Sequence, residues 1–172
     1  MFTMPVHFDE NEWFILIVLS LLVVVFWLMP RKMPISLSIL IMLFFAFLGR
    51  IADFVLAFEY PLNFYDTMDT KNYDLFDFIT YSIIYPLYGY FFADLYYRWN
   101  LKGLYRIYYI IGWIFLSLFF EHIASLLNVF HYNRWNMFSS FLAYIVTFLI
   151  VIFFLEQIKK WYNREVGKFK DV

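Results

Sequence analysis

The segment from Leu104 to Asn128 reads LYRIYYIIGWIFLSLFFEHIASLLN, an apolar run that carries a carboxylate at Glu121 and an imidazole at His122. A helix needs roughly 17–25 apolar residues to cross a bilayer, and this run is long enough. Ionisable groups are costly in hydrocarbon, so they usually face the interior of a helical bundle and often mark function. The segment therefore predicts a spanning helix with a polar group turned inward.

The composition of the whole chain agrees with this interpretation. Of the 172 residues, 64% are hydrophobic and only 16% are charged. Ordinary soluble domains are about 45–50% apolar and about 25% charged. The chain is therefore predicted to be an integral membrane protein whose first partner is the lipid bilayer. A net charge of −1 without any basic stripe argues against nucleic acid as a partner.

Five apolar runs separated by short polar segments predict an all-α bundle of five transmembrane helices. Proline and charge divide the first two runs, and the acidic segment 59–74 divides the second from the third. Pro86 predicts a kink within the third helix. The chain is read as a single domain, 1–172, with helices over about 13–29, 35–58, 75–97, 104–128 and 137–155 and a basic cytoplasmic tail over 156–172.

The distribution of positive charge predicts how these helices are threaded. Cytoplasmic loops carry an excess of Lys and Arg, which sets the orientation of the chain. With the N-terminus outside, only Lys71 and Arg134 lie in external segments and Arg50 lies within the membrane. The remaining ten face the cytoplasm: Arg31, Lys32, Arg98, Lys102, Arg106, Lys159, Lys160, Arg164, Lys168 and Lys170. We therefore expect a multi-pass protein of the plasma membrane with its N-terminus outside and its C-terminus in the cytoplasm.

Polar residues from four of the predicted helices fall at one depth in this threading. At about 1.5 Å per residue, they lie in the outer part of a core about 30 Å thick. They also recur at helical spacing, as Ser117, Glu121 and Ser125 do along the fourth helix. A polar pocket that opens outward is expected, built by the second to fifth helices. Its candidate ligand- or proton-binding residues are Arg50, Asp53, Asp77, Tyr81, Glu121, Ser125, Tyr132, Trp135 and Ser140.

The partner of Arg50 is open between two carboxylates. Arg50 and Asp53 are three residues apart on one helix, so they can form a structural ion pair. The alternative joins Arg50 to Glu121 on another helix, or to an anionic ligand. His122 points about 100° away from Glu121, so the two neighbours do not form a local acid–base pair. Arg98 follows Asp94 by four residues, which predicts a structural pair near the inner surface.

Metal, cofactor and catalytic motifs are missing from the sequence. The chain has no Cys, and its three His residues show no paired spacing for a metal ligand. No nucleophile motif or phosphate-binding loop is present. We expect no metal, no cofactor and no catalytic residue.

The combination of Glu121, Tyr132, Trp135 and Ser140 supports one resemblance. The turn Tyr132-Asn133-Arg134-Trp135 before the last helix resembles that of small polytopic, about five-helix membrane proteins found in endospore-forming Gram-positive bacteria. The matching residues cover about the last third of the chain. The resemblance implies a membrane location and a similar helix number, and it implies no activity.

Three functions remain open. The first is a membrane protein that binds or moves a proton or a small polar or cationic solute through the outward-facing pocket. The second is a structural or accessory subunit, which would associate with a membrane-protein partner or with further copies of the chain. The third is an intramembrane enzyme acting on lipid, with Glu121 and either His122 or Asp77 as acid and base. No nucleophile or metal site accompanies these residues.

Overall fold

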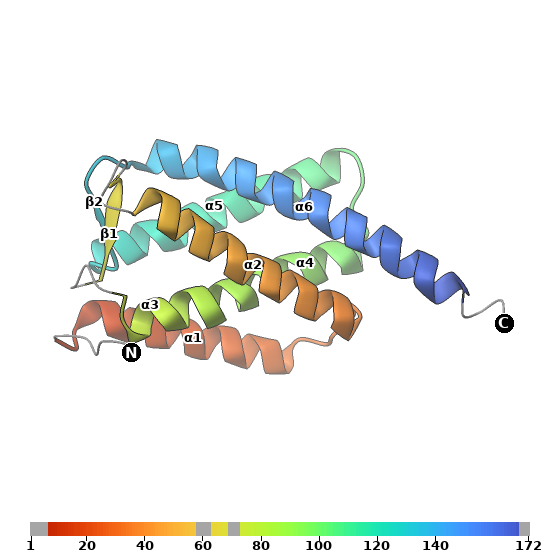
Figure 1. Cartoon of the computed structure of the whole chain (residues 1–172), viewed down its shortest axis with the longest axis horizontal. Coiled ribbons are helices and arrows are strands. Elements are labelled where there is room, and N and C mark those ends of the chain that lie inside the picture. The colour runs from red at the N-terminus through yellow and green to blue at the C-terminus, as the bar shows by residue number, and fades with distance from the viewer. Residues whose placement is uncertain (1–6, 58–62, 69–72, 169–172) are drawn as a thin grey trace.

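The computed structural model describes residues 7–57, 63–68 and 73–168, and within them the chain is almost entirely helical (Figure 1). One short two-stranded sheet interrupts the helices. The elements are α1 (Glu10–Leu28), α2 (Ile35–Leu56), β1 (Tyr65–Thr67), α3 (Leu75–Ile79), the π-helix η1 (Thr80–Ile84), α4 (Tyr85–Trp99), α5 (Leu104–Leu126), β2 (Phe130–Tyr132) and α6 (Met137–Lys168).

Four helices are long and apolar enough to cross a membrane, namely α1, α2, α5 and residues 137–164 of α6. Large apolar side chains cover the outside of the bundle, including Phe47, Phe115 and Phe153, each at least 60% exposed. Such a surface is stable in contact with lipid. The membrane location and the all-α class are thus supported, with four of the five expected spanning helices.

The run predicted as the third spanning helix, 75–97, is divided into α3, η1 and α4. Pro86 lies in the first turn of α4 and has no N–H to donate to the carbonyl oxygen four residues earlier, at Ser82. The chain widens into the π-helix directly before this proline, and such segments often occur at functional sites. The expected kink therefore takes the form of a π-helix on the N-terminal side of Pro86.

Helix α4 lies at the centre of the bundle and contributes more buried residues than α1, α2 or α5. Phe92 and Ala93 are fully buried, and Tyr90 and Tyr96 are 2% exposed. Helices α1 and α2 both pack against α4. A Cβ atom built on Gly89 would lie 2.1 Å from the ring of Phe45 on α2. The absence of a side chain at this position is therefore what allows α2 to approach α4 so closely.

The bundle closes at one end with the sheet, and we call this the sheet end (Figure 1). Strands β1 and β2 are antiparallel, with Tyr65 opposite Tyr132 and Thr67 opposite Phe130. The amide of Met68 also donates to the carbonyl oxygen of Val129 over 3.0 Å. Both segments were expected to be loops. Each strand is three residues long and pairs with a strand far away in sequence, so local pattern alone does not reveal it.

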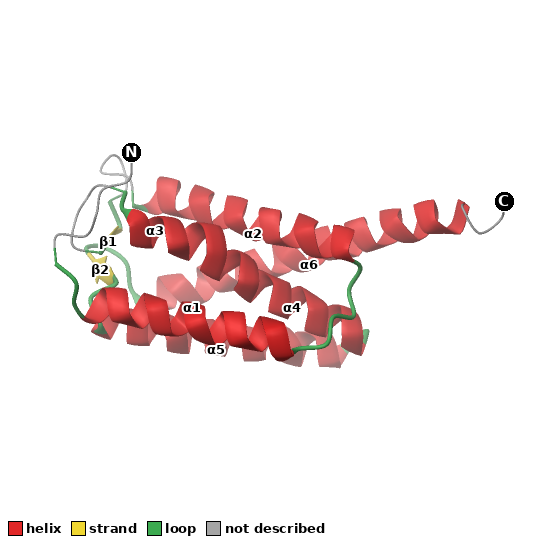
Figure 2. Cartoon of the chain, turned by 90° about the horizontal axis from the view of Figure 1, so that it is seen from below, coloured by secondary structure: helices red, strands yellow, loops and turns green. Residues whose placement is uncertain are grey.

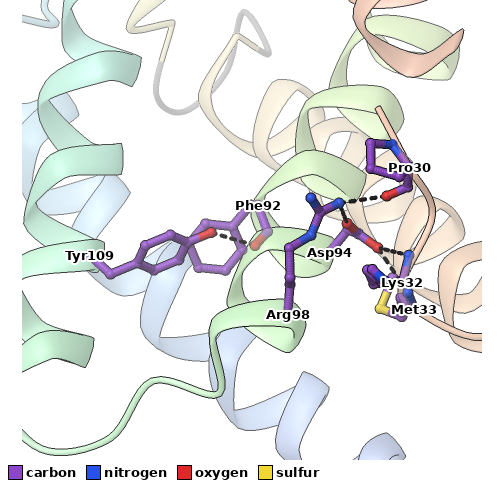
Figure 3. Close-up of polar contacts among 7 residues, drawn as sticks. All are labelled: Pro30, Lys32, Met33, Phe92, Asp94, Arg98 and Tyr109. Atoms are coloured by element: carbon purple, nitrogen blue, oxygen red, sulfur yellow. Dashed lines mark hydrogen bonds and ion pairs between the residues drawn. The ribbon is translucent and has the colours of Figure 1, made fainter. Parts of the chain in front are cut away.

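The opposite end, formed by the turns 30–34 and 100–103, is held by one buried carboxylate, and we call it the clasp end (Figure 3). Asp94 is fully buried, and its Oδ1 accepts from the amides of Lys32 (3.1 Å) and Met33 (2.9 Å). Its Oδ2 accepts from Arg98 Nη2 over 2.8 Å, and the same nitrogen donates to the carbonyl oxygen of Pro30. The expected Asp94–Arg98 pair is confirmed.

Helix α6 is longer than expected, because the fifth helix was predicted to end near residue 155. The helix continues through Glu156 to Lys168. Glu156 lies within the helix, and its Oε1 accepts from the Tyr96 hydroxyl (2.8 Å) and from Arg106 Nη2 (3.3 Å). Phe58, where the second helix was expected to end, and residues 169–172 lie outside the described residues.

Candidate functional site

Glu121 lies at the sheet end, where it accepts hydrogen bonds from two other elements. The Tyr132 hydroxyl, from β2, and the Ser140 hydroxyl, from α6, both donate to Oε1 of Glu121 over 2.5 Å. Trp135 Nε1 then donates to Ser140 Oγ over 2.7 Å. The four residues of the Glu, Tyr-x-x-Trp and Ser pattern are thus one hydrogen-bonded group, which we call the Glu121 cluster.

The expected companions of Glu121 form a second group instead. The Tyr81 hydroxyl donates to Asp53 Oδ1 over 2.6 Å. Arg50 Nη2 lies 3.4 Å from Ser82 Oγ, and its guanidinium carbon lies 4.3 Å from the centre of the Tyr73 ring. No ion pair within the described ranges joins Arg50 to Asp53 or to Glu121. Neither of the two expected pairings is formed.

The π-helix η1 explains how two consecutive residues both reach α2. In an α-helix, neighbours point about 100° apart, and the wider turn of a π-helix changes this relation. Tyr81 and Ser82 both lie in η1 and contact Asp53 and Arg50, respectively. A straight α-helix, as expected for 75–97, would place Tyr81 and Ser82 differently toward α2.

Tyr65 of β1 is within electrostatic range of both carboxylates, Asp53 and Glu121. Burial raises the pKa of Tyr65, and the nearby carboxylates of Asp53 and Glu121 raise it further. The Tyr81 hydroxyl is a hydrogen-bond partner that opposes this rise in pKa. Tyr65 is therefore a neutral phenol that lies close to the Asp53–Tyr81 pair and within electrostatic range of Glu121.

Tyr132 is a second phenol outside the spanning helices that stays protonated. Burial raises the pKa of Tyr132, and its hydrogen bond to Glu121 raises it further. A neutral phenol donates its proton into a hydrogen bond, so Tyr132 remains a donor to the carboxylate.

Two predicted site residues, Asp77 and Ser125, have local structural partners. Asp74 and Asp77 cap α3 reciprocally, since the Asp74 amide donates to Asp77 Oδ2 (3.1 Å) and the Asp77 amide to Asp74 Oδ1 (2.9 Å). Ser125 Oγ lies 3.5 Å from the carbonyl oxygen of Phe130. Asp77 and Ser125 thus lie at the sheet end without a hydrogen bond to the Glu121 cluster.

Ser117, from the polar stripe expected on the fourth helix, faces α4. The Tyr88 and Ser117 hydroxyl oxygens are 2.8 Å apart and join α4 to α5. His122 is exposed, as its angular distance from Glu121 implied.

No group of three or more potential metal ligands occurs within residues 7–57, 63–68 and 73–168. An open groove of about 440 Å³ lies on the outer surface of α1, lined by Phe8, Asp9, Glu10, Trp13, Phe14, Ile17 and Leu127. This groove contains none of the predicted site residues. At the polar layer, the candidate side chains instead contact one another.

Comparison with known proteins identifies no relative of this chain. The chain matches no protein-family model, no curated protein sequence and no solved structure. The resemblance to the small polytopic membrane proteins of endospore-forming bacteria therefore stays a prediction.

Sequence reasoning missed three residues that contribute to the polar layer. Tyr65, Tyr73 and Ser82 contact predicted site residues, and none of them was expected there. Ser82 directly follows Tyr81, and an expected break at Pro86 could have suggested a local π-turn. Tyr65 and Tyr73 reach the site only through the path of the 63–68 and 73–74 segments, which no helical period describes.

Proposed function

We propose that this chain is a plasma-membrane protein that binds or moves a proton or a small cation through the polar layer at its sheet end. In this proposal the N-terminus and the sheet face the outside, and the C-terminus faces the cytoplasm. The α3–η1–α4 run is the fifth span, since about 25 helical residues extend over roughly 37 Å. The excess of Lys and Arg at the clasp end supports this orientation.

One observation carries the proposal. Asp53 and Glu121 are partly buried carboxylates that receive hydrogen bonds from hydroxyl groups and form no ion pair with a described Lys or Arg. A carboxylate in an apolar surrounding that forms no ion pair binds a proton or a cation more readily than one that is paired. The polar layer therefore offers two carboxylates that no ion pair neutralises, which supports a role in binding a cation or a proton.

The hydroxyl groups between these carboxylates suit proton transfer. The Tyr81 hydroxyl donates to Asp53, and the Tyr132 hydroxyl donates to Glu121. Tyr65 is within electrostatic range of both carboxylates. Each hydroxyl can accept one hydrogen bond while donating another. Asp9 and Glu10 on α1 and Asp66 on β1 add negative charge at the sheet end, which attracts cations from the solution.

Proton flux into proteoliposomes tests the proposal. The full chain is reconstituted, and the internal pH is followed with a trapped dye under a potassium-diffusion potential. We expect the wild type to admit protons, and Glu121→Gln and Asp53→Asn to lower the rate at least tenfold. His122→Gln is the matched control, because His122 is the exposed neighbour of Glu121. Equal rates in wild-type, variant and protein-free vesicles, repeated for Na⁺ and K⁺, would overturn the proposal.

The alternative function as a structural or accessory subunit also has one favourable observation. The Glu121 cluster joins α5, β2 and α6, so it contributes to packing at the sheet end. A purely structural role predicts no flux in the wild type, with Glu121→Gln keeping both the fold and the capture of a constant membrane partner by cross-linking.

A further inference from the structure

The C-terminal part of α6 extends past the rest of the bundle at the clasp end (Figures 1 and 2). The helix has 32 residues, so it is about 48 Å long at 1.5 Å per residue, and the hydrocarbon core is about 30 Å thick. A helix that enters the core near Met137 leaves it about 20 residues later, near Glu156. The residues that follow therefore lie at the level of the lipid headgroups and beyond.

Exposed cations gather on this extension. Lys160 and Arg164 are exposed and four residues apart, which places them on one face of the helix. Neither forms a hydrogen bond or an ion pair with another residue of the described ranges. Trp161, beside Lys160, is 61% exposed. The extension thus presents exposed positive charge next to an exposed indole ring.

The turn between α4 and α5 adds to the same surface. Lys159 Nζ lies 3.4 Å from Asn100 Oδ1 and 5.1 Å from the centre of the Tyr97 ring. These contacts hold α6 against the turn that carries Lys102, which is exposed. We call Lys102, Lys159, Lys160 and Arg164 the cationic surface.

The described carboxylates near the cationic surface already form ion pairs with other residues. Asp94 is fully buried and bound to Arg98, and Glu156 accepts from Arg106 and Tyr96. They therefore do not neutralise the cationic surface.

Exposed tryptophan side chains on two other helices lie at the clasp end, as the cationic surface does. Trp27 is 78% exposed near the end of α1, and Trp99 is 55% exposed at the end of α4. Exposed Trp side chains concentrate at the boundary between lipid and water. Together with Trp161, they place the cationic surface at the headgroup layer.

We propose that the cationic surface binds the phosphate groups of anionic phospholipids. Lys and Arg side chains hydrogen-bond phosphate oxygens strongly, and basic residues next to a spanning helix attract anionic lipids. The inference requires α6 to cross the membrane, and it does not depend on proton or cation movement at the sheet end.

Lipid retention by the reconstituted chain tests this inference. The full chain is placed in nanodiscs with equal amounts of phosphatidylglycerol and phosphatidylcholine, extracted in mild detergent and weighed intact by mass spectrometry. We expect the retained lipid to be mainly phosphatidylglycerol. Replacing Lys102, Lys159, Lys160 and Arg164 by Gln should reduce this preference by roughly fivefold for each residue that contacts lipid, and at least tenfold together.

Arg134→Gln is the matched control, because Arg134 is an exposed cation at the sheet end. It should leave the preference for phosphatidylglycerol unchanged, while raising the salt concentration should weaken it by screening. Equal retention of the two lipids by the wild type would overturn the proposal and leave the surface for another occupant, such as an acidic protein. A preference for phosphatidylglycerol that persists when all four residues are replaced would overturn it as well.

Discussion

The two ends of the bundle both bury carboxylates, and they surround them in opposite ways. At the clasp end, Asp94 is fully buried and binds two backbone amides and the guanidinium of Arg98. At the sheet end, Asp53 and Glu121 are partly buried and receive hydrogen bonds from hydroxyl groups. Asp94 forms an ion pair, and the other two form none with a described residue.

This difference separates a structural carboxylate from a candidate functional one. A buried carboxylate with a cation and two amide donors has its charge balanced, and its position is set by the chain on three sides. A carboxylate held by hydroxyl groups can gain a proton and keep its neighbours, because a hydroxyl both donates and accepts. Stability is therefore expected to depend on the clasp end, and exchange of protons or cations on the sheet end.

The largest expected effect separates the two ends directly. Asp94→Ala leaves Arg98 and two amides without their acceptor, and breaking such a buried pair lowers the free energy of unfolding by about 3–5 kcal/mol. Glu121→Gln keeps an oxygen that accepts from Tyr132 and Ser140, so it should lower that free energy by only about 1 kcal/mol. Unfolding in mixed micelles with increasing SDS measures both. The contrast fails if the two variants lose equal stability.

A smaller effect is expected where α2 meets the π-helix. A Cβ atom on Gly49 would lie 2.5 Å from the Tyr85 ring and 3.4 Å from that of Tyr81. Overpacking of this kind lowers the free energy of unfolding by about 1–3 kcal/mol. Gly112→Ala is the control, since a Cβ atom added there would meet no atom within 4 Å and alanine favours a helix. If Gly49→Ala is as stable as Gly112→Ala, the close contact does not organise the sheet end.

The smallest effects concern the hydroxyl donors of the Glu121 cluster. Tyr132→Phe and Ser140→Ala should each lower the free energy of unfolding by about 1 kcal/mol. Because both donate to one oxygen, their effects should be coupled by at least about 0.5 kcal/mol in a double-mutant cycle. Ser125→Ala should change stability by no more than about 0.5 kcal/mol, given its long hydrogen bond. Strictly additive effects of Tyr132→Phe and Ser140→Ala would show that the cluster does not act as a unit.

The starts of four helices could be predicted from the sequence to the residue, whereas α1 begins at Glu10, three residues before its expected start. Helices α2, α3, α5 and α6 begin at Ile35, Leu75, Leu104 and Met137, as expected. Each start follows a residue that ends regular structure or caps a helix, such as Pro34 or Asp74. The ends were harder to predict. Asn128 was assigned to the fourth helix and adopts a left-handed conformation instead, with φ of 58°.

The sequence allowed us to predict several residues of the polar layer, but not the hydrogen bonds that they form with one another. The sequence placed Arg50, Asp53 and Glu121 at one level by helical rise, and the Tyr-x-x-Trp turn drew attention to Tyr132 and Trp135. Which hydroxyl meets which carboxylate depends on helix rotation and on the sheet, and these are set by packing between distant segments.

The sequence by itself determined the membrane location, the helical class and the charge difference between the ends, because these follow from composition and from periodicity along the chain. Only the tertiary structure decided that Glu121 binds Tyr132 and Ser140, that Asp53 binds Tyr81, and that Arg50 pairs with neither carboxylate. The physical reason is that a β-pairing of three residues and a five-residue π-helix set these contacts. The β-pairing joins segments far apart in the chain, and the contacts that the π-helix makes with α2 are likewise between distant segments, which a local pattern does not contain.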